Sequence, residues 1–130
     1  MVIFRTRLIV KDNSGARWVR VLRVLGKDKK TAFVGDIVLV SVLNYVQHTL
    51  LKKRSTFLGV IIGIVCWKRR LSGVFVKFFF NSVLLFSKHC KFLGTRVYGL
   101  FLLEVNVVKN NDKKNRQFFL KIISYNRGLI

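Results

Sequence analysis

The sequence predicts a single, mainly β domain, and three observations lead to this fold class. The chain has 130 residues, the length of one ordinary domain. Its apolar residues recur with a period of two, broken by short turn signals, which is typical of an all-β domain rather than of βαβ units. Hydrophobic residues make up 52% of the chain, which excludes a disordered basic tail.

Four strands are predicted in the first half of the chain. A turn at 12–15 joins the first two, because its Asn and Gly tolerate positive φ, and Gly35-Asp36 forms a tight turn before the third. The third strand is apolar at both its odd and its even positions, so we expect it to be buried on both faces or to close a barrel. Loops are expected at 26–30 and 47–55. The four predicted strands are Arg5 to Lys11, Arg17 to Leu25, Ile37 to Val46 and Leu58 to Val65.

The second half is predicted to add two strands and then two short helices. The strands, Val74 to Phe79 and Ser82 to Ser87, follow a basic segment and a turn at Ser72-Gly73. The helix candidates are Leu103 to Val108 and Gln117 to Tyr125, on either side of a polar loop. Most of the 12 Phe fall in apolar runs and are expected in the core rather than as platforms for RNA bases.

The charge of the chain points to a polyanionic partner. Lys and Arg number 25 against 5 acidic residues, giving a formal charge of +20. Self-repulsion on this scale opposes folding unless a polyanion lies nearby, and nucleic acid is the first candidate. A single basic run is often only a solvated face, but these runs together form a field that phosphates neutralise. The clusters are Arg5 and Arg7, Lys27 to Lys30, Lys52 to Arg54, Lys68 to Arg70, Lys88 to Lys91, and Lys113 to Arg116.

Enzymatic, metal-binding and membrane roles lack support in the sequence. The five acidic residues are scattered singly, so no carboxylate pair for acid–base chemistry is formed. His and Cys residues lack the spacing of a zinc site, and the two cysteines favour a reducing compartment. No Gly-Lys-Ser or Gly-Lys-Thr phosphate loop occurs. We therefore expect no catalytic residue, no metal, no cofactor and no membrane span, since even the longest uncharged stretch, 37–51, is too short to cross a bilayer.

Several ordered motifs carry a resemblance to a known family. The chain has an Asp-Asn-Ser-Gly-Ala turn after a Thr-led strand, an Arg-Val-Leu-Gly element and a Gly-Asp-hydrophobic strand. It also has a Gly-Thr-Arg-Val-Tyr-Gly element and a final Phe-x-Lys-Ile-x-Ser. These motifs stand at 6–17, 23–26, 35–42, 94–99 and 119–124, with a diagnostic series between them at Gly59-Val60-Ile61-Ile62, Ser72-Gly73, Phe78, Asn81 and Leu84-Leu85. In this pattern the chain resembles the universal large-subunit ribosomal protein fourteen family.

The resemblance implies a fold and a set of partners. The fold class it implies is a small five-stranded β-barrel with a hairpin extension and two short C-terminal helices. The barrel would cover about 4–99 and the tail about 100–130, with a basic insertion at 107–117. The implied partners are large-subunit rRNA, small-subunit rRNA across an intersubunit bridge, and neighbouring ribosomal proteins. No cofactor is implied.

The resemblance and the basic clusters together give the expected site residues. At the subunit interface we expect Thr95, Arg96 and Lys121, which match positions where some relatives bind a ribosome silencing factor. Asn13 and Ser14 are candidates for phosphate or sugar contacts, although turn geometry alone also explains them. The expected rRNA contacts are Arg5, Arg7, Lys11, Asn13, Ser14, Arg17, Lys27, Lys29, Lys30, Lys52, Lys53, Arg54, Lys68, Arg69, Arg70, Lys88 and Lys91.

The chain departs from the family pattern in two places. Two arginines of the family's bridge-forming segment are missing near 100–106, and Phe79 and Phe80 replace an acidic pair. The second change predicts a new protein neighbour or deeper burial in the assembly. The alternative function is a free-standing β-barrel that binds single-stranded RNA, which requires exposed aromatic residues on one face.

Composition and the start of the match lead to an expected location. The absence of Pro, with 12 Phe and many Lys, Ile and Asn, is the bias of a gene rich in A and T. The family match begins within the first six residues, so no import sequence is expected ahead of it. We therefore expect a mitochondrially encoded protein of the mitochondrial ribosome, with a plastid or a bacterial cytoplasm as alternatives.

Overall fold

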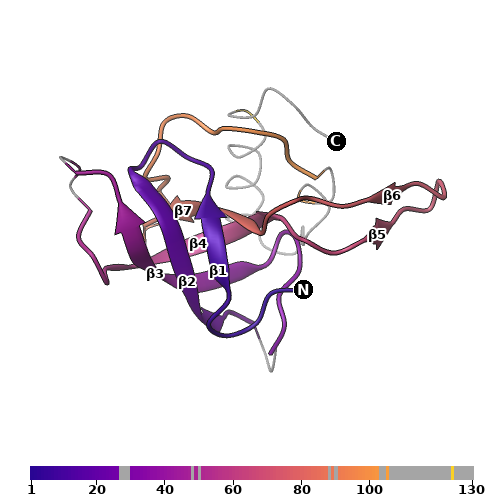
Figure 1. The fold of residues 1–130 in the computed structure, drawn as a ribbon, viewed down its shortest axis with the longest axis horizontal. Helices are drawn as coiled ribbons and strands as arrows, with labels where there is room; N and C mark the ends of the chain where they lie inside the picture. Colours follow the sequence, from indigo (N-terminus) through magenta and orange to yellow (C-terminus); the bar gives the residue numbers. More distant parts are fainter. Residues whose placement is uncertain are drawn as a thin grey trace.

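Five strands close into a β-barrel in the computed structural model of the chain. The strand order around the barrel is β1-β2-β3-β4-β7, and a separate two-stranded sheet contains β5 and β6 (Figure 1). The barrel strands are β1 Arg7–Val10, β2 Ala16–Val24, β3 Ile37–Tyr45, β4 Thr56–Gly63 and β7 Ser82–Phe86. The structure describes residues 1–26, 30–47, 49, 51–87, 89, 91–102, 105 and 124.

Closure of the barrel depends on one parallel pair. Four neighbouring pairs are antiparallel, whereas β1 runs parallel to β7 with Ile9 opposite Ser82 and Val10 opposite Val83. Because every barrel strand has two neighbours, no edge of the barrel sheet is left open for pairing with another chain. The predicted mainly β, five-stranded barrel is therefore confirmed.

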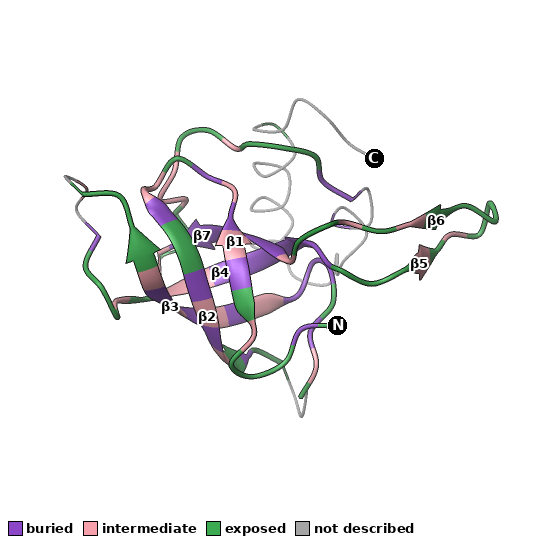
Figure 2. Cartoon of the chain, viewed as in Figure 1, coloured by how far each residue is buried: buried purple, intermediate pink, exposed green. Residues whose placement is uncertain are grey.

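Valine fills the barrel interior by simple alternation. In β3, Val38, Val40 and Val42 are fully buried, while the residues between them are partly exposed. Of the two alternatives for this apolar strand, the structure supports barrel closure rather than burial on both faces. The buried colour in Figure 2 is concentrated on the barrel strands, and β4 and β7 contribute its largest buried segments.

The first strand is shorter than the sequence predicted. We expected a strand from Arg5, but β1 begins at Arg7. Arg5 has a φ of 67°, in the left-handed region, and the Thr6 N–H donates to the Ile3 carbonyl at 3.2 Å. This turn changes the chain direction, so a strand cannot begin before it.

A hairpin of β5 Lys68–Arg69 and β6 Phe75–Val76 projects from the barrel (Figure 1). The sequence predicted its turn and the hairpin extension, but β5 was missed and β6 was expected to reach Phe79. Gly73 has a φ of 83° in the connecting turn, which suits a residue without a side chain. Lys68 and Arg69 of the basic segment therefore form a strand, because they pair with β6.

The prediction that most Phe residues lie in the core is confirmed only for part of the described Phe residues. Phe86 and Phe101 are buried, and Phe57, Phe78 and Phe92 are partly buried and pack against the core. Phe79 is 91% exposed and Phe80 is 56% exposed, because the chain there connects the hairpin to β7. Other exposed rings are those of Phe4, Phe33 and Phe75.

The C-terminal helices and the insertion at 107–117 fall almost wholly outside the described residues. Phe101, Leu102 and Val105 are described, and all three are buried in the core cluster. The chain therefore continues to contribute apolar packing beyond the Gly99 turn. The expected division at about residue 99 stays a prediction.

Candidate RNA-binding surfaces

The carboxylates of the described residues are buried. Asp12 and Asp36 are the described acidic residues, and both are buried. Asp12 accepts from the Ser14 and Leu85 N–H groups, each at 2.9 Å, and Asp36 accepts from the Phe33 N–H at 3.1 Å. No exposed carboxylate occurs among the described residues, so the outer surface of this part of the chain is strongly positive.

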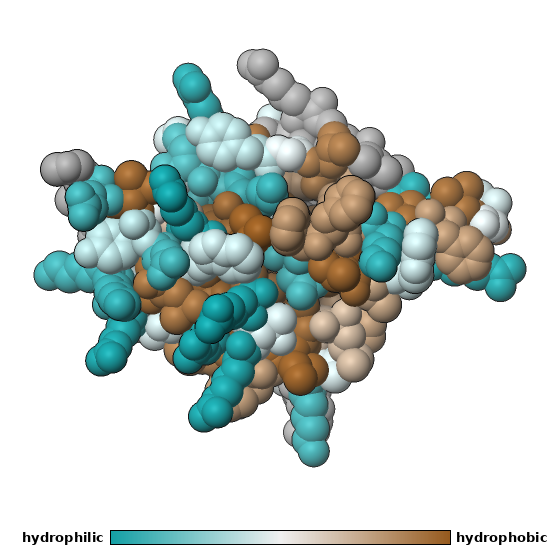
Figure 3. Space-filling model, in the orientation of Figure 1, coloured by the Kyte–Doolittle hydropathy of each residue, from teal (hydrophilic) through white to brown (hydrophobic). Residues whose placement is uncertain are grey.

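A shallow hollow lies on the outer face of β1, β2 and β3. It encloses about 360 Å³, and a second hollow of about 450 Å³ shares Leu43, Asn44 and Lys53 with it. Hydrophilic side chains stand out over β1 and β2 on the face turned to the viewer in Figure 3. We call this surface the basic face, and we define it as Arg7, Arg17, Trp18, Arg20, Asn44 and Lys53.

Strand register brings these side chains together from distant parts of the sequence. Arg7 of β1 lies opposite Arg20 of β2, and Trp18 of β2 lies opposite Asn44 of β3. Lys53 reaches the same hollow from the loop after β3. Like charges directly opposite each other in a sheet are destabilising, so the Arg7–Arg20 pair favours a bound anion.

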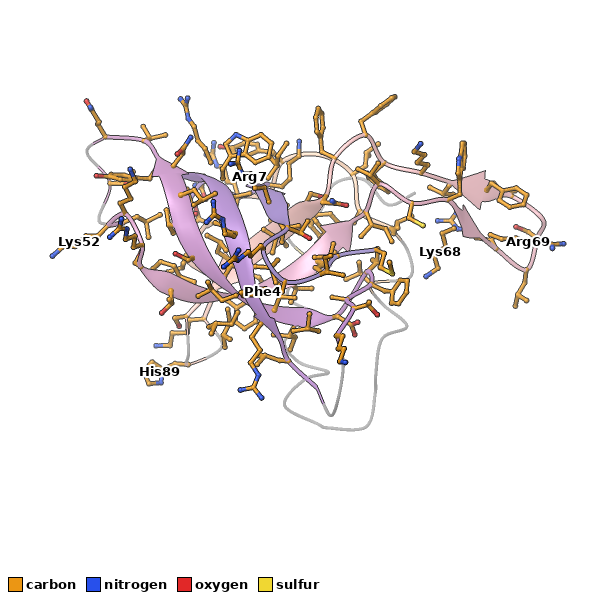
Figure 4. All side chains as sticks on the ribbon, turned by 60° about the horizontal axis from the view of Figure 1, so that its bottom comes forward. Phe4, Arg7, Lys52, Lys68, Arg69 and His89 are labelled. Atoms are coloured by element: carbon orange, nitrogen blue, oxygen red, sulfur yellow. The ribbon has the colours of Figure 1, made fainter. Side chains whose placement is uncertain are left out.

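The structure places the predicted basic residues in several patches. Arg7, Arg17 and Lys53 meet on the basic face, with Lys52 and Arg54 exposed on the same loop as Lys53. Figure 4 shows Lys52 at one end of the molecule and Lys68 and Arg69 at the other, on the hairpin. Lys27, Lys29, Lys88 and Lys121 lie outside the described residues. The remaining predicted basic contacts are Arg5, Lys30, Lys91 and Arg96, which are exposed, and Lys11 and Arg70, which are half-buried.

Sequence reasoning missed three members of the basic face. Arg20, Trp18 and Asn44 were not among the expected contacts, because they lie on strands and outside the clusters of basic residues. A usable signal was present, since Val19 and Val21 face the core and strand alternation turns Trp18 and Arg20 outward.

A second site joins the turn at 12–15 to the Gly-Thr-Arg element. The Asn13 side-chain oxygen accepts from the Thr95 N–H at 2.7 Å and from the Arg96 N–H at 3.0 Å. Its amide Nδ2 donates to the Thr95 hydroxyl at 2.9 Å. Asn13 thereby holds the exposed Thr95–Arg96 segment, and its expected contact with rRNA stays a prediction.

Gly94 permits this close approach. A Cβ atom at Gly94 would lie 2.7 Å from Asn13 Oδ1 and 2.9 Å from the Cβ of Asp12, which is too close for a side chain. The Tyr98 N–H donates to the Lys11 carbonyl at 2.7 Å, and Asp12 pairs with Val97 through a β-bridge. Backbone pairing therefore holds the segment 94–98 against the residues that follow β1.

Removing the Asn13 side chain should loosen the Thr95–Arg96 segment. Asn13→Ala deletes three hydrogen bonds at the protein surface, for an expected loss of about 1 to 2 kcal/mol. We expect the Thr95 and Arg96 amides to exchange with deuterium roughly tenfold faster, while the Val83 amide in β7 is unchanged. Equal exchange in both proteins would contradict this holding role.

The described part of the chain offers little for catalysis. No group of three His, Cys, Asp or Glu residues capable of holding a metal occurs in it. Cys66 is exposed, and His48 and Cys90 lie outside the described residues. Within the same part, no helix is both long enough and apolar enough to cross a membrane.

The fold and surface define a small basic β-barrel protein suited to a polyanionic partner. A family model described as ribosomal protein L14p/L23e matches residues 1–127. A protein named large ribosomal subunit protein uL14 from Petrotoga mobilis (strain DSM 10674 / SJ95) is 40% identical over 106 residues, which cover 81% of this chain and 87% of the relative. The chain belongs to the L14p/L23e family of ribosomal proteins, so its role is structural and not enzymatic.

Proposed function

We propose that the chain binds large-subunit rRNA through its basic face and lies at the subunit interface of the ribosome. Family membership makes it a structural constituent of the large ribosomal subunit. The observation that carries the rRNA contact is the hollow lined by Arg7, Arg20 and Lys53 on a surface where the described carboxylates are buried. Phosphates neutralise such a surface, whereas an acidic protein would have to supply several carboxylates at the same spacing.

The Thr95–Arg96 segment is our candidate for the bridge to small-subunit rRNA. Both residues are exposed, and Asn13 accepts a hydrogen bond from the backbone N–H of each. The planar guanidinium of Arg96 would lose little entropy for each hydrogen bond that it donates to a phosphate. The same segment would bind a ribosome silencing factor if one is present, together with Lys121, which lies outside the described residues.

A neighbouring ribosomal protein is the proposed partner of the segment before β7. Phe79 and Phe80 are largely exposed, and they stand where the resemblance expects two acidic residues. Two adjacent exposed rings favour an apolar contact in the assembly over contact with water. The insertion at 107–117 is proposed to add a further contact with rRNA or protein.

We place the protein in the mitochondrial ribosome. The support is compositional, since the absence of Pro and the 12 Phe match a gene rich in A and T. The relative from Petrotoga mobilis shows that a bacterial ribosome offers an alternative setting for the same family.

Fractionation of ribosomes tests this proposal. Mitochondrial ribosomes of the source organism would be separated into subunits on a sucrose gradient, and the chain would be followed by mass spectrometry. We expect it in the large-subunit peak. Recovery with the small subunit or at the top of the gradient would overturn the proposal, and recovery only from cytoplasmic or plastid ribosomes would overturn the location.

A further inference from the structure

Trp18 is the aromatic member of the basic face. It lies on the outside of the barrel, 37% exposed, and lines the hollow of about 360 Å³ on the basic face. Its neighbours across the strands are Ile9 on one side and Asn44 on the other. An indole half-open to solvent beside cationic side chains can stack on a flat ligand.

The charges around Trp18 indicate the rest of that ligand. Arg7 and Arg20 are direct cross-strand partners, so their side chains repel each other without an anion between them. Lys53 adds a third positive charge to the same hollow. A ligand with a flat ring and at least one phosphate would satisfy both the tryptophan and the cations.

We propose that this hollow binds a single unpaired nucleotide of RNA. The base stacks on Trp18, the adjoining phosphates lie against Arg7, Arg20 and Lys53, and the Asn44 amide donates to and accepts from the base edge. The hollow falls in the usual size range for a small-ligand site. A base inside a duplex is stacked and paired, so the nucleotide must be splayed out of a loop or bulge. This inference rests on the proposed contact between the basic face and rRNA.

Fluorescence of Trp18 reports stacking directly. Trp67 is the other tryptophan, and Trp67→Phe leaves Trp18 as the only one in the full-length chain. Titration with a single-stranded RNA octamer should quench its emission. A blunt duplex long enough to stay paired should bind by charge and leave the emission nearly unchanged.

Affinity measurements on matched variants supply the second readout. Trp18→Leu should weaken binding of the octamer by roughly 10-fold and binding of the duplex by less than about 2-fold. Trp18→Phe should restore most of the octamer affinity, since it retains an aromatic face. Phe33→Leu is the control, because it removes an exposed ring outside the hollow and should affect neither RNA.

The outcomes separate this inference from the proposed function. If the wild-type chain binds neither RNA at moderate salt, the rRNA contact itself is wrong. If both RNAs bind but Trp18 is not quenched, or if Trp18→Leu weakens both equally, the basic face contacts only backbone and the nucleotide site is overturned. Adenosine monophosphate should bind far more weakly than the octamer, and equal affinity would overturn the RNA site in favour of a site for free nucleotides.

Discussion

Replacing Arg7, Arg20 and Lys53 together by glutamine should lower the affinity of the full-length chain for RNA by roughly 100-fold at 0.1 M salt. These residues line one hollow, and each is expected to neutralise a phosphate. Log affinity decreases with log salt, and each phosphate contact adds about 0.7 to 0.9 to the steepness of this decrease. The triple variant should therefore show a salt dependence that is shallower by about 2. Titrations with a short RNA at several salt concentrations measure both quantities.

A control with equal charge distinguishes the basic face from net charge. Arg23 and Lys77 are exposed, are not among the expected rRNA contacts and do not line the hollows of the basic face. Their replacement by glutamine removes the same formal charge as the replacement of Arg7 and Arg20, and we expect it to cost much less affinity for a short RNA. Equal losses in these two double variants would mean that overall charge, and not this surface, holds the RNA.

Replacing Asp12 by alanine should lower the free energy of unfolding by about 3 kcal/mol. Asp12 is buried at the end of β1, and its two oxygens accept the N–H of Ser14 in the turn and of Leu85 in β7. Alanine leaves both donors without this partner and opens the junction between β1 and β7. Urea unfolding of the two proteins measures the loss, and a difference below about 1 kcal/mol would contradict the account.

Asp12→Asn tests the role of charge at the same position. Burial raises the pKa of the Asp12 carboxyl above its ordinary value of 3.8, although hydrogen bonds from Ser14 and Leu85 oppose the rise. The folded state therefore holds this proton more tightly than the unfolded state does. The tighter binding of this proton stabilises the folded wild type. This contribution to the free energy of unfolding is complete below pH 3.8 and is lost as pH rises through the folded pKa.

The advantage of the wild type over Asp12→Asn should accordingly shrink across that pH window. The asparagine does not titrate, so it serves as the reference for all other ionisable groups. Unfolding experiments at a series of acidic pH values would measure the difference. An advantage that grows with rising pH would show that the hydrogen bonds, and not burial, dominate the pKa.

Much of the fold could be predicted from the sequence, because a period of two and short turns are local properties. The turn at 12–15 and the strands around it were expected within a few residues of their observed bounds. The parallel pairing of β1 with β7 could not be predicted from local patterns, because it depends on contacts between distant segments. The exposed Phe79 shows a related difficulty, because apolar character alone does not tell a core strand from a connection outside the barrel.

The candidate site was predictable only in part for the same reason. Basic residues were predicted to be phosphate ligands from their type, and Arg7, Arg17 and Lys53 do lie on one face. Their meeting on one face depends on strand register, which also brings in Arg20 and Trp18. The hydrogen bonds between Asn13 and the Thr95–Arg96 segment join residues more than 80 positions apart, so no local sequence pattern predicts them.

Ultraviolet crosslinking of intact large subunits tests the central claim most directly. Digestion and mass spectrometry would identify which peptides of the chain are joined to RNA, and sequencing would identify the RNA. We predict crosslinks from the peptide that contains Trp18 and from the loop that contains Lys53, both to large-subunit rRNA. Crosslinks confined to the β5–β6 hairpin or to other surfaces, with none from the basic face, would contradict it.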